Sequence, residues 1–310
     1  MGKVMAVDRT REGILLRAKK RSGREGRFPY QLLIPSALVL ALVSVYPLYQ
    51  GIRASMTTYI FGRPAGFAGT KNYVDILHDD TFREALALTA KFVIIVVTLE
   101  TVLGLGLALL LVSKVKFAKT IRLIILAPMA VAPVVVGIIW RLMYASDVGV
   151  VSPIFTALGF DDPLVLARPT SAFIGLVVVD VWEWTPLLFL ICLAGLQSLP
   201  QEPLEAAMVD GAGPVRVFLQ HTLPLLAPVL SVGIILRLID AIGTFDQIFV
   251  LTRGGPGSAT QLMSIYAYNT AFSFTQYGHG TAMLVLLTLI VFALMMVAFY
   301  LMRRAARISA

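Results

Sequence analysis

QSLPQEPLEAAMVDGAGPVRVFLQHTLP, residues 197–224, is a short polar island between two long apolar segments. Within it the run Glu205-Ala206-Ala207 is followed after three residues by Gly211, and after eleven more by Leu223-Pro224. Soluble proteins have little use for a polar island of this length between apolar runs of about 20 residues.

The island predicts a short, exposed helix. Pro203 suits a first helical turn, where its missing N–H costs little. Residues 204–210 are mostly good helix formers, and Gly211 can adopt the left-handed conformation that often ends a helix. Ala206 and Ala207 keep one face thin, which predicts that the helix enters a groove on another protein.

Two further features extend this prediction. The Glu205 carboxylate is placed where a partner arginine could bind it. A second amphipathic segment, residues 214–220, precedes Leu223-Pro224, where the next apolar segment begins. We expect the short helix and that segment to move together.

Composition identifies a membrane protein with several spans. The 310 residues are 58% hydrophobic and 14% charged, well outside the balance of soluble domains. A helix needs roughly 20 apolar residues to cross a bilayer core. Six stretches qualify, which predicts an all-α membrane protein with six transmembrane helices: residues 30–54, 88–112, 121–144, 172–196, 223–243 and 281–302.

The basic residues predict the orientation. With the N-terminus inside, seventeen Lys and Arg lie on the cytoplasmic side, including Lys114 and nine residues of a basic arm at 1–27, against five in the external loops. The positive-inside rule then places both termini in the cytoplasm. We expect residues 28–310 to form one transmembrane domain, with residues 197–222 as a cytoplasmic loop.

Several other functions are disfavoured. The net charge of +8 comes from basic residues that flank apolar spans, which favours attraction to membrane lipid over nucleic-acid binding. Cys192 is the only cysteine, and the three histidines are scattered, so neither a metal site nor a catalytic constellation is predicted. Residues 66–71 do not match a phosphate-binding loop, so the chain is not expected to hydrolyse ATP itself.

The spacing of the island resembles the EAA loop of binding-protein-dependent ABC importer permeases, although His221 stands where Ile is usual. Asp246, Leu251-Thr252 and Gly254-Gly255-Pro256 are similar to the segment after the fifth span in the maltose-type sugar permeases, with Arg253 where Gly is common. The resemblance covers nearly the whole chain from Phe28.

This resemblance implies the type I ABC importer permease fold in a bacterial plasma membrane. It also implies a second homologous permease subunit, two ATPase subunits that bind ATP and Mg²⁺, and an extracytoplasmic binding protein that delivers a sugar or sugar derivative. The residues expected to couple to the ATPase are Glu205, Ala206, Ala207, Asp210, Gly211, Leu223 and Pro224.

Charged side chains at membrane depth are functional candidates by default. Arg237 lies roughly 20 Å beyond Pro224 along a helix, with Asp240 one turn further, and an internal ion pair between them is favoured over contact with substrate. Glu100 is expected to pair with Arg237 or to line the same cavity. In the fourth span, the residues that suit a sugar are Asp180, Trp182, Glu183 and Trp184.

A group of external residues is assigned to a gate or to docking of the binding protein, with a solvated loop as the alternative. Its members are Asp246, Gly254, Gly255, Pro256, Tyr266, Tyr268 and Asn269.

Two other functions stay open on sequence grounds. A secondary transporter driven by an ion gradient would place carboxylates or unwound glycine-rich segments at the midplane, and would not need the polar island. A membrane enzyme would need a nucleophile and a base, which the sequence does not place together.

Overall fold

The computed structural model describes residues 28–112, 116–151, 153 and 165–308. The basic arm at 1–27 and Lys114 lie outside the described residues. The chain divides into two compact units, residues 1–54 and residues 55–310. The described part of the first unit is helix α2 (Phe28–Ser55), which ends one residue inside the second unit.

Helix α2 confirms the first predicted apolar helix. It continues through Pro35 and Pro47, and its described side chains from Leu33 to Gln50 are exposed. A helix that is apolar on all sides and exposed within its own unit is suited to contact lipid or another apolar surface.

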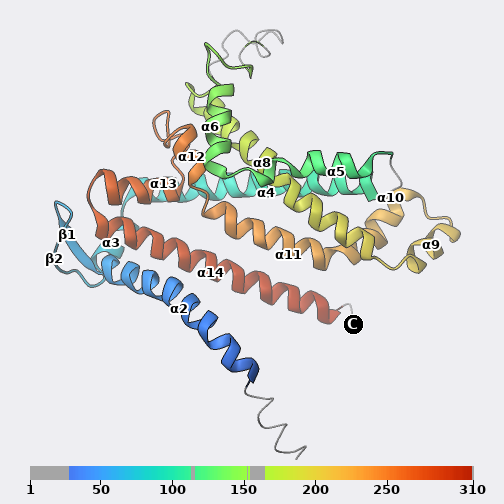
Figure 1. The fold of residues 1–310 in the computed structure, drawn as a ribbon, viewed down its shortest axis with the longest axis horizontal. Helices are drawn as coiled ribbons and strands as arrows, with labels where there is room; N and C mark the ends of the chain where they lie inside the picture. The colour runs from blue at the N-terminus through green and yellow to red at the C-terminus, as the bar shows by residue number, and fades with distance from the viewer. Residues whose placement is uncertain (1–27, 113–115, 152, 154–164, 309–310) are drawn as a thin grey trace, which may run out of the picture. The chain divides into compact units, whose positions relative to one another are not determined.

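Four long helices form the second unit: α4 (Asp80–Val112), α8 (Pro169–Ser198), α11 (Leu223–Ile242) and α14 (Tyr277–Ile308). With α2, they make five helices in the described residues that are long and apolar enough to cross a membrane. In Figure 1, α4, α11 and α14 run lengthwise through the unit, and α8 packs on both α4 and α11. Helix α4 begins eight residues before the predicted span at 88–112.

The predicted continuous span at 121–144 is wrong. The chain forms α5 (Ala118–Leu126), a 3₁₀ turn η1 (Pro128–Ala130) and α6 (Pro133–Met143) instead, and α5 and α6 point in different directions (Figure 1). Each proline removes a backbone donor, and Ala132, before the second one, is extended with ψ of 138°. The helix is therefore interrupted where two prolines lie five residues apart, whereas α8 stays continuous through the single Pro186.

The segments predicted as external loops contain more regular structure than expected. Residues after α2 form a hairpin of β1 (Thr57–Ile60) and β2 (Arg63–Phe67), closed by Phe61 and Gly62 with positive φ. Helix α3 (Lys71–Leu77) follows, and residues 78 and 79 separate it from α4, which begins at Asp80.

Residues 244–280 fold into α12 (Asp246–Leu251), α13 (Met263–Tyr268) and the π-helical turn η3 (Asn269–Ser273). This segment packs into the unit, since Ile248, Leu262 and Ile265 are fully or almost fully buried. Helix α12 packs on α6, where Arg141 Nη1 donates to the Val250 carbonyl at 3.0 Å.

The centre of the unit is the contact between α4 and α8. Gly104 permits the close approach, because a Cβ atom there would lie 2.7 Å from the Phe189 amide nitrogen and 2.9 Å from Leu188 Cβ. Small residues at such contacts are characteristic of packing between membrane helices. The contact continues into an apolar cluster that joins Ala108 of α4, Phe189 of α8 and Leu226 of α11.

Candidate functional site

The first candidate site is the α9 loop, residues 197–222, which contains α9 (Glu202–Val209). The predicted capping is confirmed: Pro203 lies in the first turn, and Gly211 has φ of +83°. The Ala212 amide donates to the Ala207 carbonyl at 3.0 Å and the Gly211 amide to the Met208 carbonyl at 3.1 Å. These are the two hydrogen bonds of a Schellman motif, so this glycine ends the helix sharply.

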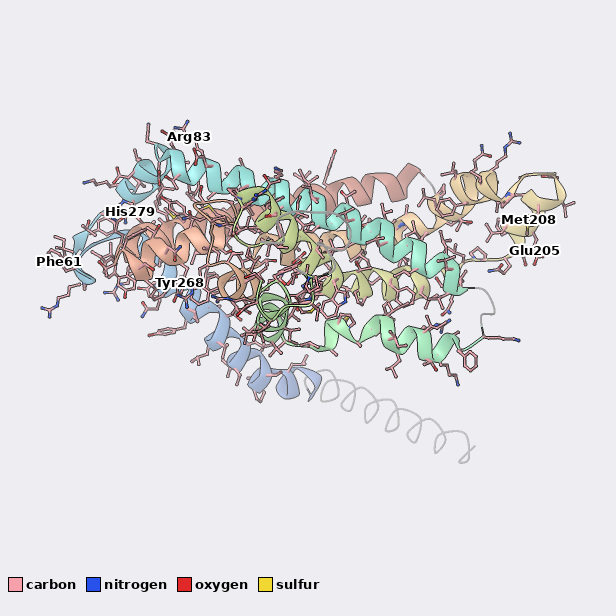
Figure 2. All side chains as sticks on the ribbon, turned by 90° about the horizontal axis from the view of Figure 1, so that it is seen from above. Phe61, Arg83, Glu205, Met208, Tyr268 and His279 are labelled. Atoms are coloured by element: carbon pink, nitrogen blue, oxygen red, sulfur yellow. The ribbon has the colours of Figure 1, made fainter. Side chains whose placement is uncertain are left out.

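The α9 loop lies at one end of the second unit. Figure 2 shows Glu205 and Met208 at this end, and Phe61, Tyr268 and His279 at the opposite end. The side chains of Glu205, Ala206 and Asp210 are exposed, and Met208 and Val209 add exposed apolar surface. An exposed carboxylate beside apolar side chains is a surface that another protein can contact.

Ala207 departs from the prediction. Its side chain is 7% exposed, so it faces the inside of the loop, whereas the prediction placed it with Ala206 on the thin outer face. A small residue at this position lets α9 pack against the segments that follow it. The outer face of α9 therefore has Ala206 as its small residue.

After the non-helical residues 210–213, the last part of the α9 loop is helical and continues into α11 without a break. Helix α10 (Pro214–Val217) leads into the π-helical turn η2 (Phe218–Thr222), which leads into α11 at Leu223 and Pro224. The predicted amphipathic segment is therefore helical, but Val215 and Leu219 are exposed. A continuous helix can transmit a displacement of the α9 loop to the centre of the unit.

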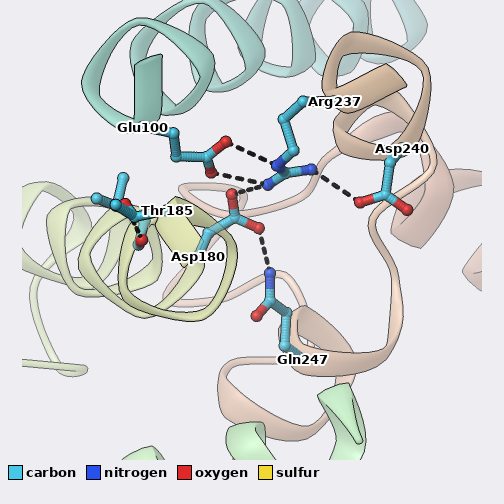
Figure 3. A network of polar contacts seen from close by, with 7 residues as sticks. Glu100, Asp180, Thr185, Arg237, Asp240 and Gln247 are labelled. Carbon is cyan, nitrogen blue, oxygen red and sulfur yellow. Dashed lines mark hydrogen bonds and ion pairs between the residues drawn. The ribbon is translucent and has the colours of Figure 1, made fainter. Parts of the chain in front are cut away.

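The second candidate site is the Arg237 network, defined as Glu100, Asp180, Arg237, Asp240 and Gln247 (Figure 3). Arg237 on α11 donates to both oxygens of Glu100 on α4, from Nε at 2.7 Å and from Nη2 at 3.0 Å. Its Nη2 also contacts Asp180 on α8, and its Nη1 donates to Asp240 at 2.9 Å. The sequence expectation that Arg237 pairs with Asp240 and Glu100 is confirmed.

Because most of the network is buried, the loss of the Arg237 charge would cost much stability. Arg237, Glu100 and Asp180 have no exposed side-chain surface, while half of the Asp240 side chain is exposed. Three carboxylates surround one guanidinium, and its bidentate contact with Glu100 has the geometry that Arg and carboxylates favour. Removing the cation would leave buried carboxylates without compensation.

Sequence reasoning missed Gln247. This residue is on α12, it is 1% exposed, and its Nε2 donates to Asp180. The network therefore links four helices, α4, α8, α11 and α12. A glutamine next to Asp246 in a predicted loop offered no signal of burial.

The polar residues of the fourth predicted span separate onto different sides of α8. Asp180 and Glu183, one turn apart, are both buried, whereas Trp182 is 42% exposed. Trp184 lies beside Arg237, whose Cζ is 5.2 Å from the indole ring centre, in cation–π geometry. Glu183 Oε2 and Gln247 Oε1 are buried oxygens without a hydrogen-bond partner among the described residues.

An apolar groove of about 450 Å³ lies beside Trp182. Leu99 and Leu103 of α4, Ile125 of α5 and Val178 of α8 contribute to its lining. The edge of Trp182 packs against Trp140 of α6 with ring centres 5.6 Å apart. The exposed indole therefore lies between an apolar groove and a second aromatic ring.

Most of the residues assigned to an external gate or docking face make packing contacts or hydrogen bonds that a solvated loop would lack. Tyr266 is half-buried and donates a hydrogen bond to Asp79. The Tyr268 ring packs against Phe249 in T-shaped geometry and against Phe272 in tilted geometry, with ring centres 5.1 and 4.9 Å away. Gly254, with φ of +94°, belongs to a turn closed by the Thr260 amide donating to its carbonyl at 3.1 Å. Pro256 follows in this turn, Asp246 is exposed in the first turn of α12, and Asn269 opens η3.

Comparison with known proteins shows one family. Residues 100–307 match the model of the binding-protein-dependent transport system inner membrane component. The chain is 39% identical over 266 residues to the trehalose/maltose transport system permease protein MalF of Thermococcus litoralis, covering 85% of this chain and 89% of that protein.

Two other relatives have similar coverage. The sulfoquinovosyl glycerol transport system permease protein SmoG of Agrobacterium fabrum is 36% identical, with 86% of this chain and 85% of that protein covered. The trehalose transport system permease protein SugA of Mycobacterium tuberculosis is 32% identical, with 90% and 89% covered.

Among solved structures, the fold is similar to a chain of a bacterial alginate ABC transporter crystallised with an alginate pentasaccharide-bound periplasmic protein. The TM-score is 0.77 at 21% identity, with 89% of this chain and 93% of that chain covered. At this identity the likeness concerns the fold alone.

Proposed function

This chain belongs to the family of binding-protein-dependent transport system inner membrane components, and from that premise we propose that it is the permease subunit of an ATP-driven importer for a sugar or sugar derivative. The substrate class is supported by three relatives whose names specify trehalose or maltose, sulfoquinovosyl glycerol, and trehalose. The unpaired oxygens of Glu183 and Gln247 support it independently, because they could accept hydrogen bonds from hydroxyl groups of a ligand.

The working assembly contains this chain, a second homologous permease, two ATPase subunits and an extracytoplasmic binding protein. ATP and Mg²⁺ bind to the ATPase subunits, which carry out hydrolysis. The permease supplies the path through the inner membrane, and part of the selectivity resides in the binding protein.

In this assembly the chain crosses the membrane six times and has both termini in the cytoplasm. The broken segment α5–η1–α6 makes the third crossing, supported by the apolar character of both helices. Residues 1–27 form a basic cytoplasmic arm, and residues 28–310 form the transmembrane domain.

The α9 loop is the contact with the ATPase subunits. ATP binding brings those subunits together and moves α9, and the continuous helix α10–η2–α11 transmits the movement to Arg237. Because Arg237 bonds to three carboxylates on different helices or turns, the network favours discrete arrangements of α4, α8 and α11. These arrangements correspond to the inward-facing and outward-facing states of the path.

One observation carries the proposal: the exposed Glu205 lies on a capped helix that packs on α10 and η2, and the continuous helical segment α10–η2–α11 leads from there to the buried Arg237. The test is Glu205→Lys in the assembled transporter. Since disrupting a buried interfacial charge pair costs about 2–5 kcal/mol, sugar uptake should fall by about tenfold or more. The amount of subunit in the membrane should not change.

The matched control is Glu84→Lys, which reverses another exposed carboxylate, on α4. Uptake by this control should stay close to wild type. Wild-type uptake by Glu205→Lys would contradict the role of α9 as the ATPase contact.

A further inference from the structure

The end of the second unit opposite α9 contains a small acidic pocket, whose lining shares no residue with the Arg237 network or with the apolar groove beside Trp182. We define the acidic pocket by Asp75 of α3, Asp79, Tyr266 of α13, Thr270 of η3 and His279 of α14. Its volume is about 280 Å³. Pockets for drug-sized ligands measure roughly 300–1,000 Å³, so this one suits a single side chain or a ligand of similar size.

The polar groups of the pocket are mostly acceptors. Asp75 Oδ2 is 3.5 Å from His279 Nε2, and 43% of the Asp75 side chain is exposed. Asp79 accepts hydrogen bonds from the Thr81 amide at 2.9 Å and from the Tyr266 hydroxyl. Each carboxylate has about four lone-pair directions, so both retain capacity for another donor.

A buried hydroxyl completes the set. Thr270 is 4% exposed, and its Oγ1 makes no hydrogen bond within the described part of the chain. Buried polar atoms normally have a partner, so an unpaired hydroxyl in the lining of a pocket points to a missing donor or acceptor.

Apart from Gln276, the remaining lining residues are apolar. Ile76 and Met283 are almost fully buried, and Phe274 is 63% exposed. Apolar walls together with carboxylates suit a side chain that has an apolar stem and a cationic head, which is the character of Lys and Arg. None of the described lining residues is itself Lys or Arg.

A metal ion is a poorer occupant. Among the described residues, no three His, Cys, Asp or Glu side chains are grouped so that they could hold one. The position of the pocket limits which partner can reach it. His279 lies at the end of the unit opposite Glu205 (Figure 2), and the proposed orientation places that end on the extracytoplasmic side.

We propose that the acidic pocket binds a Lys or Arg side chain of the extracytoplasmic binding protein when that protein docks. The inference rests on the proposed function, because it takes the binding protein and the orientation from it. The cationic head contacts Asp75 and Asp79, and the stem packs against Phe274 and Met283. Through this ion pair the permease recognises the binding protein, and the sugar does not pass through the pocket.

The experiment uses the complete transporter in lipid nanodiscs and the fluorescently labelled binding protein encoded with it. The variant is Asp75→Lys, which reverses an exposed charge whose one ion pair in the described residues is with His279. Its matched control is Asp147→Lys, which reverses an exposed carboxylate that does not line the pocket. Basal ATPase activity without binding protein verifies that each complex is assembled.

Asp75→Lys should weaken binding of the labelled protein by about tenfold or more at low ionic strength, with a smaller effect at high salt, as expected for an exposed charge pair. The control should bind like wild type. A Lys→Asp or Arg→Asp change on the binding protein should restore binding to Asp75→Lys.

Three results would overturn the inference: unchanged affinity of Asp75→Lys, an equal loss in the control, or weakened use of sugar with unchanged affinity for the binding protein. The last result would identify the pocket as a sugar site. Failure of the proposed function is seen separately, because the wild-type complex would then show no ATPase stimulation by the sugar-loaded binding protein.

Discussion

At the scale of single residues, Arg237 is the position on which most of the buried polar structure depends. It contacts three carboxylates, and the two that are buried, Glu100 and Asp180, are 137 and 57 residues away in the chain. A buried ion pair is weak evidence for stability, but a broken one is strongly destabilising. The main effect of the network is therefore to specify which helices pack together, and not to add stability.

Arg237→Met should destabilise the assembled transporter by about 3–5 kcal/mol, because Glu100 and Asp180 would remain buried without a cation. Glu100→Gln should have a smaller effect, since the guanidinium keeps Asp180 and Asp240. Thermal unfolding in detergent, followed by loss of the monodisperse complex, measures both. Arg63→Met, at an exposed site on β2, is the control, and equal melting temperatures for all three variants would contradict this account.

Tyr266 makes a second prediction at this scale. Burial, with a further contribution from its hydrogen bond to Asp79, raises the pKa of Tyr266 to about 12. Its ordinary value is about 10. The stability from the neutral phenol is therefore fully present below pH 10 and is lost as pH rises through about 12.

Tyr266→Phe removes the donor to Asp79 and should lower stability by about 1–3 kcal/mol. The difference in melting temperature from wild type should be constant between pH 6 and pH 9. A difference that disappears within this range would show that another titrating group is responsible.

At the scale of elements, the contact between α4 and α8 and the break between α5 and α6 organise the unit. The first depends on the absence of a side chain at Gly104. The second depends on two prolines, Pro128 and Pro133. The break leaves α6 free to pack on α12, and α12 in turn supplies Gln247 to the Arg237 network.

Gly104→Ala should destabilise the subunit by about 1–3 kcal/mol, because the new methyl group would overlap the backbone of Phe189. Gly106→Ala on the same helix is the control, since a Cβ there meets nothing within 4 Å. That control should be neutral or stabilise the helix by up to about 1 kcal/mol. If the two variants melted at the same temperature, close packing at Gly104 would not be limiting.

At the scale of the whole molecule, lengthwise helices of the second unit join the two ends to which we assign functions. The α9 loop is at one end, the acidic pocket is at the other, and the Arg237 network is buried among α4, α8, α11 and α12 (Figures 2 and 3). An importer requires this separation, because ATP and the delivery protein are on opposite sides of the membrane.

The orientation can be tested with single cysteines, since Cys192 is the only cysteine and is buried. On a Cys192→Ser background that retains uptake, Phe61→Cys should react with a membrane-impermeant maleimide in intact cells. Met208→Cys should react only after the cells are permeabilised. Both parent side chains are exposed, 94% and 56%, so access to the reagent and not burial decides the result. The reverse pattern would contradict the cytoplasmic position of α9.

Local features of the sequence were sufficient for a large part of this description. Apolar length identified the long helices, proline and glycine marked the start and end of α9, and the spacing from Glu205 to Pro224 indicated the family. These features depend on residues close together in the chain, where propensity and capping act directly. Pro128 and Pro133 were also visible in the sequence. A proline inside a membrane helix does not always interrupt it, as Pro186 in α8 shows, so the break itself could not be predicted.

Only the tertiary structure decided which side chains meet. It brought Gln247 from a predicted loop into contact with Asp180, turned Ala207 inward, and placed Asp75 and His279 in one pocket. The reason is physical: a polar group buried in an apolar interior must find a partner, and the partner can lie anywhere that packing brings a helix face. The sequence alone therefore determined the membrane class and the capped helix α9, and packing determined the Arg237 network and the acidic pocket.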